Sequence, residues 1–327
     1  MDNKPVSCHL VGEFFGVDGK QLQQQYKDHI SEFHSWDQKE HASDWMIFPV
    51  NMGTSLSIDE TALSNGELYT ILTNKAAKGG KGTIVAMLKG TQTEQIITVL
   101  EKIPLRKRNK VIEVTMDMAA SMVKAVRRCF RNAERVIDRF HVQKLSCDAV
   151  QEARIKHRWE ALDEENRLIE AAKRNKHPYQ PELLPNGDTL KQLLARSRYL
   201  LFKHPAKWTP SQKERADILF PRYPQLYKAY ELSIRLGNIF TICKSKEQAF
   251  KRLAIWYNEV EAAGIDAFKT VARSVQTHYL SILNFFNNRS TNASAESFNA
   301  KIKAFRATSR GVRDTTFFLF RLAKIYA

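Results

Sequence analysis

Three acidic residues are spaced in a way that could serve phosphoryl chemistry. Asp59 and Asp117 each close a short β-type run, and Glu296 lies on an amphipathic helical segment late in the chain. Carboxylates form a hard, all-oxygen donor set, which suits Mg²⁺ or Mn²⁺ rather than zinc. Two such ions, about 3.5–4 Å apart, can clamp the attacking and leaving oxygens of a phosphodiester. The acids therefore predict a two-metal site, in which Asp59 bridges both ions and the other two acids each complete one.

Each of these acids also has a structural interpretation. Asp117 precedes a helical segment and could be its N-cap. Asp59 could be a turn residue, and the adjacent Glu60 is a rival for any chemical role. Glu296 stands near a helix start, where a carboxylate offsets the helix dipole. No single acid decides the matter, but acids at the ends of two strands together with a third on a helix favour the metal site.

The segment that carries Glu296, residues 292–306, has the pattern of a helix with two opposed faces. At about 100° per residue, its apolar and its polar side chains separate. The apolar face comprises Phe298, Ile302 and Phe305, and the polar face comprises Glu296, Asn299 and Lys303. We expect the apolar face to dock on a core, which leaves Glu296 to meet partner acids from elsewhere in the chain.

Basic residues follow Glu296 closely. They are Lys301, Lys303, Arg306, Arg310 and Arg313. The structural interpretation is a solvated helix face. Beside a metal site, these cations and the amide of Asn299 would instead contact DNA, because phosphate oxygens accept hydrogen bonds from such side chains.

The first half of the chain predicts an α/β sheet that would position the two aspartates. The β-type runs are residues 54–59, 67–73, 82–88, 110–116 and 133–137, and helical spacing occurs at 93–100 and 118–130. This β-β-β-α-β-α-β order predicts a mixed sheet with helices on its faces. If the first and fourth strands are adjacent and parallel, Asp59 and Asp117 project from one edge, where open α/β sheets place ligands.

A glycine-rich stretch, residues 75–81, joins the second and third strands and predicts a hairpin connection. It resembles a phosphate-binding P-loop only superficially, because the first glycine of that motif is missing and no helix follows.

Helical patterns dominate residues 145–286, with breaks at proline-bearing segments. They predict a large α-helical insertion before the Glu296 helix. The expected organisation is a helical leader at 1–53, a first core part at 54–144, the insertion at 145–286, and a final core part at 287–327. Within the leader, residues 8–31 fit either a reduced helix-turn-helix or a helical hairpin packed on the main domain. Residues 31–53 are interpreted as a linker or leader.

Composition restricts the class of protein. The 327 residues carry a formal net charge of +16, which favours a polyanionic partner such as nucleic acid. The four cysteines are scattered without zinc-ligand spacing. No apolar run is long enough for a membrane span, and the N-terminus lacks the pattern of a signal peptide. We therefore expect a cytosolic protein without membrane partners.

Several stretches together resemble the DDE transposases of bacterial insertion sequences, specifically the ISL-three family, which is related to Mutator and hAT transposases. The matching stretches are residues 56–60, 114–117, 138–144, 194–202, 292–306 and 311–313. The resemblance spans about residues 54 to 322. It implies a ribonuclease H-like fold whose α-helical insertion precedes the last catalytic helix. It also implies Asp59, Asp117 and Glu296 as the catalytic triad, holding two Mg²⁺ (or Mn²⁺) ions.

The same resemblance assigns Asp138 and His141 to an accessory D-x-x-H signature. Their structural alternatives are a helix cap for Asp138 and a hydrogen-bonding role for His141. The activity implied is DNA cleavage at element ends, followed by transfer of the exposed 3′-hydroxyl into target DNA. The alternatives are a structure-specific nuclease on the same fold and a DNA-binding protein with an inactive site.

The partners implied are element-end and target DNA, and at least a second copy of the chain, within a bacterial cytoplasm and at its nucleoid. Family members usually carry an N-terminal zinc-binding and helix-turn-helix module, whereas only 58 residues precede Asp59 here. The resemblance therefore leaves two sources for end recognition: a reduced module at residues 8–31, or a separate DNA-binding polypeptide.

Overall fold

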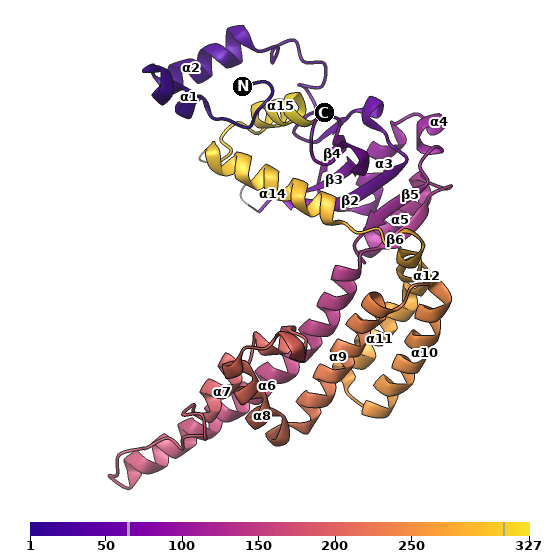
Figure 1. Ribbon diagram of the computed structural model, residues 1–327. Coiled ribbons are helices and arrows are strands. Elements are labelled where there is room, and N and C mark those ends of the chain that lie inside the picture. Colours follow the sequence, from indigo (N-terminus) through magenta and orange to yellow (C-terminus); the bar gives the residue numbers. More distant parts are fainter. Residues whose placement is uncertain (64–65, 310) are drawn as a thin grey trace. The chain divides into compact units, whose positions relative to one another are not determined.

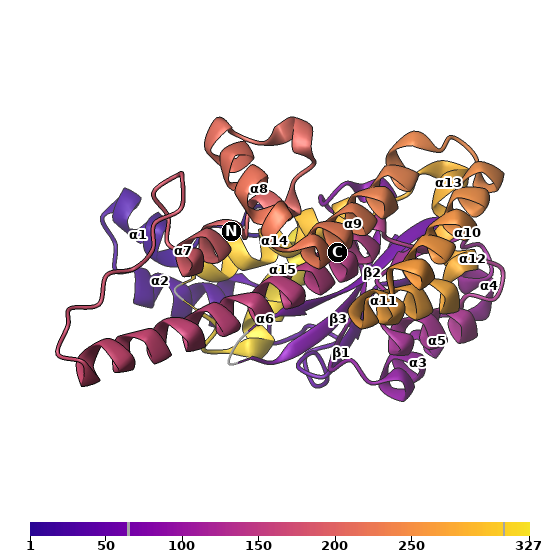
Figure 2. The same ribbon diagram turned by 90° about the horizontal axis from the view of Figure 1, so that it is seen from below.

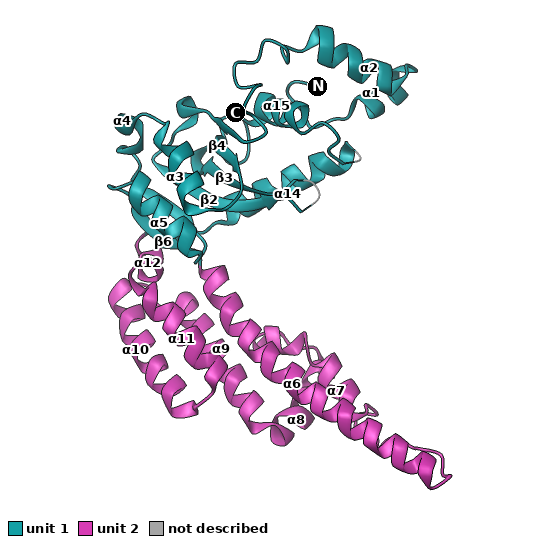
Figure 3. Cartoon of the chain, turned by 180° about the vertical axis from the view of Figure 1, so that it is seen from behind, with its two compact units in different colours: residues 1–138, 288–327 teal, residues 139–287 magenta. Residues whose placement is uncertain are grey.

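The computed structural model describes residues 1–63, 66–309 and 311–327. The chain divides into two compact units (Figure 3). Unit 1 comprises residues 1–138 and 288–327, and unit 2 comprises residues 139–287. The sequence-based organisation differs in three respects: it separates residues 1–53 from the core, begins the insertion six residues later, at 145, and ends it one residue earlier, at 286.

Unit 1 is built on one six-stranded mixed sheet with the order β1-β4-β3-β2-β5-β6 (Figure 1). The strands are β1 (Trp45–Ile47), β2 (Ser55–Ala62), β3 (Leu68–Asn74), β4 (Ile84–Lys89), β5 (Glu113–Met116) and β6 (Glu134–Ile137). The first four strands pair in antiparallel fashion, whereas β5 lies parallel to β2 and β6 parallel to β5. The five predicted strands and the mixed sheet are confirmed.

Strand β1 was not predicted, so the interpretation of residues 31–53 as a linker is wrong in part. Trp45, Met46 and Ile47 pair with β4, and the Met46 side chain is fully buried. The ring of His41 stacks on Trp45 at a centroid distance of 3.6 Å. The strand has only three residues and polar neighbours, so the sequence around it shows no alternating pattern long enough to predict a strand.

Helices cover both faces of the sheet (Figure 2). They are α3 (Thr93–Glu101), α4 (Leu105–Arg108) and α5 (Ala120–Cys129), and, from the end of the chain, α14 (Ala293–Thr308) and α15 (Thr315–Tyr326). The apolar face of α14 is buried in one cluster with sheet residues and with α15; it contributes Phe298, Ile302 and Phe305. This packing confirms the predicted apolar face and brings the polar face of α14 toward β2.

The N-terminal segment forms a helical hairpin that packs on α15. Helix α1 (Cys8–Phe15) ends at Gly16, whose φ of 67° lies in the left-handed region that glycine favours. Helix α2 (Gly19–Gln25) continues into a π-helical turn at Tyr26–Ile30. One apolar cluster joins the hairpin and its extension to α15; it contains Cys8, Tyr26, Phe33, Phe317 and Phe320. Lys27 pairs with Asp314 at 2.7 Å.

Unit 2 is helical throughout the secondary structure assigned to residues 139–287. Its helices are α6 (Arg139–Arg174), α7 (Leu190–Arg196), α8 (Pro210–Arg222), α9 (Pro224–Ile242), α10 (Lys246–Ala263), α11 (Asp266–Thr277) and α12 (Tyr279–Leu283), with α13 (Phe285–Asn288) at the boundary. The buried indole of Trp256 on α10 donates to the carbonyl of Leu232 on α9 (2.9 Å). In the described part of the chain, every helix is too short or too polar to cross a bilayer.

Candidate active site

The register of two parallel strands brings Asp59 and Asp117 together. Ser57 of β2 pairs with Thr115 of β5, and each aspartate stands two residues beyond its member of that pair. Neighbouring strands lie about 4.8 Å apart, so the two carboxylates are cross-strand neighbours on one face. One detail of the prediction needs correction. Asp59 lies within β2 and not at its end, because pairing with β3 carries the strand on to Ala62.

Asp59 faces helix α14. Its partner in the β2–β3 ladder is Ile71, whose side chain belongs to the core beneath α14. The amide of Asn299 on α14 donates to Asp59 Oδ2 at 2.9 Å and to the carbonyl of Glu60 at 3.1 Å. The backbone N–H of Glu60 donates to Asp59 Oδ1 (2.9 Å). These bonds fix the orientation of the carboxylate.

Asp117 follows β5 directly and is half-buried. Its Oδ1 accepts the backbone N–H of Ala119 at 2.8 Å. The helix-capping interpretation is therefore correct in part, since Ala119 is the N-cap residue of α5 and has no side-chain cap of its own. This one bond engages one carboxylate oxygen and turns Asp117 toward the end of the strand.

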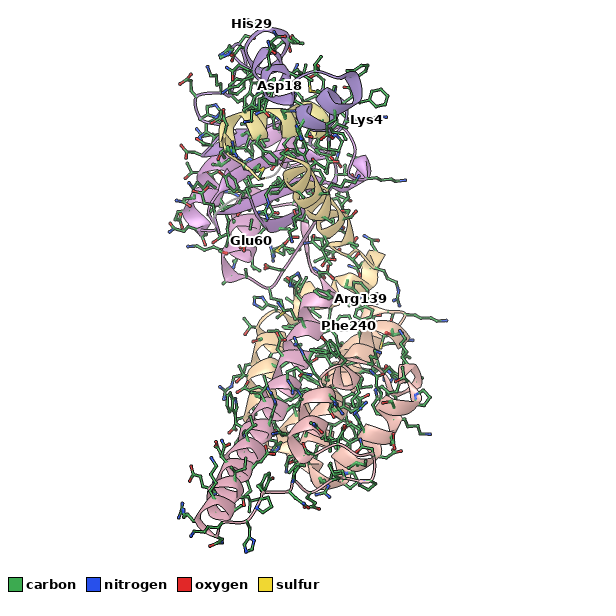
Figure 4. All side chains as sticks on the ribbon, turned by 90° about the vertical axis from the view of Figure 1, so that its left-hand side faces the viewer. Lys4, Asp18, His29, Glu60, Arg139 and Phe240 are labelled. Carbon is green, nitrogen blue, oxygen red and sulfur yellow. The ribbon has the colours of Figure 1, made fainter. Side chains whose placement is uncertain are left out.

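Glu60 adds a third carboxylate to this sheet edge. Burial raises its pKa, and the nearby charges of Asp117 and Asp59 raise it further. Figure 4 shows Glu60 at the end of unit 1 that lies away from Asp18 and His29 of the N-terminal segment. Among the described residues, no Lys, Arg or His lies within ion-pair distance of Glu60, Asp117 or Glu296. Glu60, Asp117 and Glu296 therefore have no cationic partner among the described side chains.

Glu296 is exposed on α14 between two residues that contact β2. Asn292 precedes it by four positions and Asn299 follows by three, so all three share one helix face. Asn292 Nδ2 donates to the carbonyl of Ile58 (3.4 Å), while Asn299 contacts Asp59. Glu296 therefore lies on the side of α14 that faces the strand carrying Asp59.

Asp138 fixes the start of the same helix. It is only 2% exposed, and its Oδ2 accepts the backbone N–H of Asn292 at 2.7 Å. Its own N–H donates to the carbonyl of Met116, the residue before Asp117 (2.9 Å). Asn292 is fully buried, and its Oδ1 has no hydrogen-bond partner among the described residues. This contact ties α14 to the ends of β5 and β6. The helix cap considered for Asp138 stays a prediction.

Some of the residues predicted to contact DNA form hydrogen bonds within the protein, and others are exposed to solvent. Asn299 is 8% exposed and its amide is engaged by Asp59, so it faces the strand and not solvent. Lys301 donates to the carbonyl of Gly79 in the β3–β4 hairpin (2.7 Å), and Arg306 to the carbonyl of Leu63 (2.7 Å). Lys303 and Arg313 are exposed. Arg310 lies outside the described residues.

His141 belongs to unit 2, because it lies in the first turn of α6. It is half-buried, and its ring contacts Phe140 edge to face at 5.7 Å. Its accessory role stays a prediction.

The sequence did not reveal a buried ion pair behind the two aspartates. Lys75, beside the β3–β4 hairpin, donates to Glu113 Oε1 at 3.0 Å and to the Thr115 hydroxyl. Burial would raise the pKa of Glu113, but hydrogen bonds from Ser290, Lys75 and Asn288 lower it overall. The pair joins the turn after β3 to β5, and the amide of Asn288, which donates to Glu113 Oε2 at 3.4 Å, joins β5 to the segment before α14. No local signal predicts it, because its members are distant in the sequence.

The chemistry of the donor set fits divalent cations. Asp59, Asp117 and Glu296 offer oxygen ligands, which Mg²⁺ and Mn²⁺ prefer. In the described ranges, no group of three His, Cys, Asp or Glu side chains is close enough to form a complete metal site. The arrangement places two acids close together on the sheet and a third on the side of α14 that faces β2.

A mixed sheet with β5 parallel to β2, helices on both faces and a helical insertion before the last elements defines a ribonuclease H-like fold. A profile of the ISL-three family of DDE transposases matches residues 56–322. The chain belongs to this transposase family, and both the resemblance and the fold class expected from the sequence are confirmed. No curated protein matches the chain significantly.

Proposed function

We propose that the chain catalyses metal-dependent cleavage of DNA at the ends of its element and joins the exposed 3′-hydroxyl to target DNA. The observation that carries the proposal is the register of β2 and β5, which makes Asp59 and Asp117 neighbours on the face below the Glu296 helix. Transesterification conserves the energy of the phosphodiester bond, so the reaction needs no nucleotide cofactor.

Asp59, Asp117 and Glu296 are the proposed ligands for two Mg²⁺ (or Mn²⁺) ions. When bound, such ions polarise the phosphodiester, lower the pKa of the attacking water and stabilise the leaving oxygen. The mutual proximity of Asp59, Glu60 and Asp117 favours their binding, because neighbouring carboxylates repel one another until a cation is present. The raised pKa of Glu60 agrees with this repulsion.

The other residues of unit 1 hold this constellation. Asn299 and the Glu60 N–H orient Asp59, and the Ala119 N–H orients Asp117. Asp138 holds the start of α14 and thereby positions Glu296. Lys303 and Arg313 are exposed on or just after α14, and we propose that they follow the DNA backbone.

A strand-transfer assay tests the proposed reaction. The full chain is incubated with precut duplex ends, target plasmid and Mg²⁺, and joined products are resolved on a gel. Joined product that disappears with EDTA is the expected result. Hydrolysis without joining would identify a nuclease on the same fold, and binding without either reaction would identify a DNA-binding protein with an inactive site. Because family members act on paired ends, we also propose that at least two copies, with or without a separate end-reading polypeptide, form the active complex.

A further inference from the structure

Unit 2 contains a buried arginine whose hydrogen-bond partners are neutral. Arg154 on α6 is only 6% exposed. Its Nε donates to Gln151 Oε1 at 2.7 Å, and its Nη1 donates to the carbonyl of Leu194 on α7 at 2.9 Å. These acceptors satisfy donors of the guanidinium but do not neutralise its charge, and a buried charge without a counterion is unfavourable.

Two exposed arginines lie beside it and add charge of the same sign. Arg158 follows Arg154 by one helical turn, and Arg198 lies just beyond α7. Gln151 connects the group, since its amide donates to the carbonyl of Arg198 at 3.2 Å while its oxygen accepts from Arg154. Burial lowers the pKa of Arg154, and the charges of Arg158 and Arg198 lower it further. We call these three residues the arginine cluster.

Acids do not balance the arginine cluster. Among the described residues, no carboxylate lies within ion-pair distance of any of its members, although other arginines of unit 2 have such partners. Arg196 and Arg215, for example, both pair with Asp188. Residues 139–287 contain 25 Lys and Arg against 16 Asp and Glu, which gives this unit a formal charge of +9. The arginine cluster is therefore a local concentration of positive charge that no described acid neutralises, in a unit that is basic as a whole.

We propose that the arginine cluster binds phosphates of the DNA on which the transposase acts. Guanidinium groups match phosphate oxygens in geometry and charge, and an anion would supply the missing counterion for Arg154. Arg198 also lies over the ring of Tyr199 at 5.6 Å, and this contact holds its guanidinium at the surface. Unit 2 would then bind the DNA backbone through residues distinct from those proposed on α14. This inference rests on the proposed function, because that function supplies the DNA.

The test measures binding of a fluorescein-labelled duplex of arbitrary sequence to the full chain, by anisotropy, over a range of KCl concentrations without divalent metal. The variant Arg158→Ala/Arg198→Ala removes the two exposed members and keeps the buried one. Each phosphate contact contributes about −0.9 to the slope of log K against log[salt]. Loss of two contacts should therefore make this negative slope shallower by about 2. The unfolding midpoint should stay unchanged.

The matched control is Arg167→Ala/Arg174→Ala. It removes the same charge from exposed arginines of the same helix, each of which pairs with an acid, Glu164 at 3.2 Å and Glu170 at 3.6 Å respectively. Its salt slope should stay close to that of the unmodified chain. An unchanged slope in the cluster variant, or an equal fall in both variants, would overturn the proposal. The binding readout needs no cleavage, so failure of strand transfer would sink the proposed function without affecting this result.

Discussion

The two units place buried or half-buried carboxylates in opposite electrostatic surroundings. In unit 2, Asp188 is 1% exposed and pairs with Arg196 and, at 2.8 Å, with Arg215. Burial alone would raise its pKa, but hydrogen bonds from the two arginines lower it overall. In unit 1, the sheet edge brings Asp59, Glu60 and Asp117 together, and the pKa of Glu60 is raised.

The difference separates a structural carboxylate from a candidate catalytic one. Asp188 contributes to folding because its charge is neutralised where it stands. The acids at the sheet edge repel one another, so they oppose folding slightly but favour a divalent cation. Arginines show the corresponding difference. Arg215 pairs with an acid, whereas Arg154 has no acidic partner among the described residues. Like charges held close together therefore mark the candidate functional surfaces of both units.

The largest effect is expected for Asp117→Asn. The substitution keeps the size and the acceptor for the Ala119 N–H but removes a metal-binding charge, so cleavage should fall at least about a thousandfold. DNA binding without metal should be retained. Cleavage assays and anisotropy on the same preparation measure both quantities, and cleavage at the unmodified rate would remove Asp117 from the site.

Asp188→Asn should have the opposite profile. It leaves Arg196 and Arg215 without their carboxylate, so the free energy of unfolding should fall by about 2 kcal/mol, with Arg196 half-exposed and able to regain water. Urea denaturation measures the loss. Cleavage per folded molecule should be preserved at a temperature where the variant is folded. A loss of cleavage without a loss of stability would contradict the structural role.

Asp138 stands between these cases, because it touches the helix of Glu296 and not the proposed metal ions. Asp138→Ala removes the acceptor for the Asn292 N–H, and cleavage should fall about 10–100-fold, as for other residues that orient ligands. Asp138→Asn retains one carbonyl oxygen for that bond and should recover part of the rate. Equal rates in the two variants, at equal unfolding midpoints, would show that the bond does not position Glu296.

A smaller effect separates the two acidic sites by pH. The raised pKa of Glu60 means that the folded state binds its proton more tightly, so the residue destabilises the fold as pH rises through that pKa. Asp188 has a lowered pKa, so its contribution is present above the unfolded value of about 3.9 and is lost as pH falls through the folded value.

Glu60→Gln should therefore raise the unfolding midpoint at pH 7, by about 1–2 °C because Glu60 is partly exposed, and the gain should vanish at acidic pH. The deficit of Asp188→Asn should shrink only below about pH 4. Thermal scans in the absence of divalent metal compare the two variants. A midpoint for Glu60→Gln below that of the unmodified chain at pH 7 would show that the Glu60 charge does not oppose folding.

The sequence was sufficient to predict most strands and helices but not the tertiary contacts between them. Short β-type runs predicted β2 and β5, and helical spacing predicted α14, because each pattern is local. The three-residue β1 was missed, since tertiary pairing and not propensity makes it a strand. Within the candidate site, Asp59, Asp117 and Glu296 could be chosen from type and position.

The contacts that orient those acids could not be read in advance. Asp138 meets Asn292, and Lys75 meets Glu113, across long stretches of chain whose register only the fold defines. The neutral surroundings of Arg154 are equally invisible in the sequence, because they depend on how α6 packs against α7. The only related signal in the sequence is the asparagine at position 292, where the segment that carries Glu296 begins.

The most direct test of the shared site is anomalous diffraction from crystals of the full chain grown with DNA ends and Mn²⁺. We expect a peak between Asp59 and Asp117, with ligand distances of about 2.1 Å, and a Glu296 oxygen in the coordination sphere of an ion there. A peak bound elsewhere, or ions at the two aspartates with Glu296 out of reach, would contradict it.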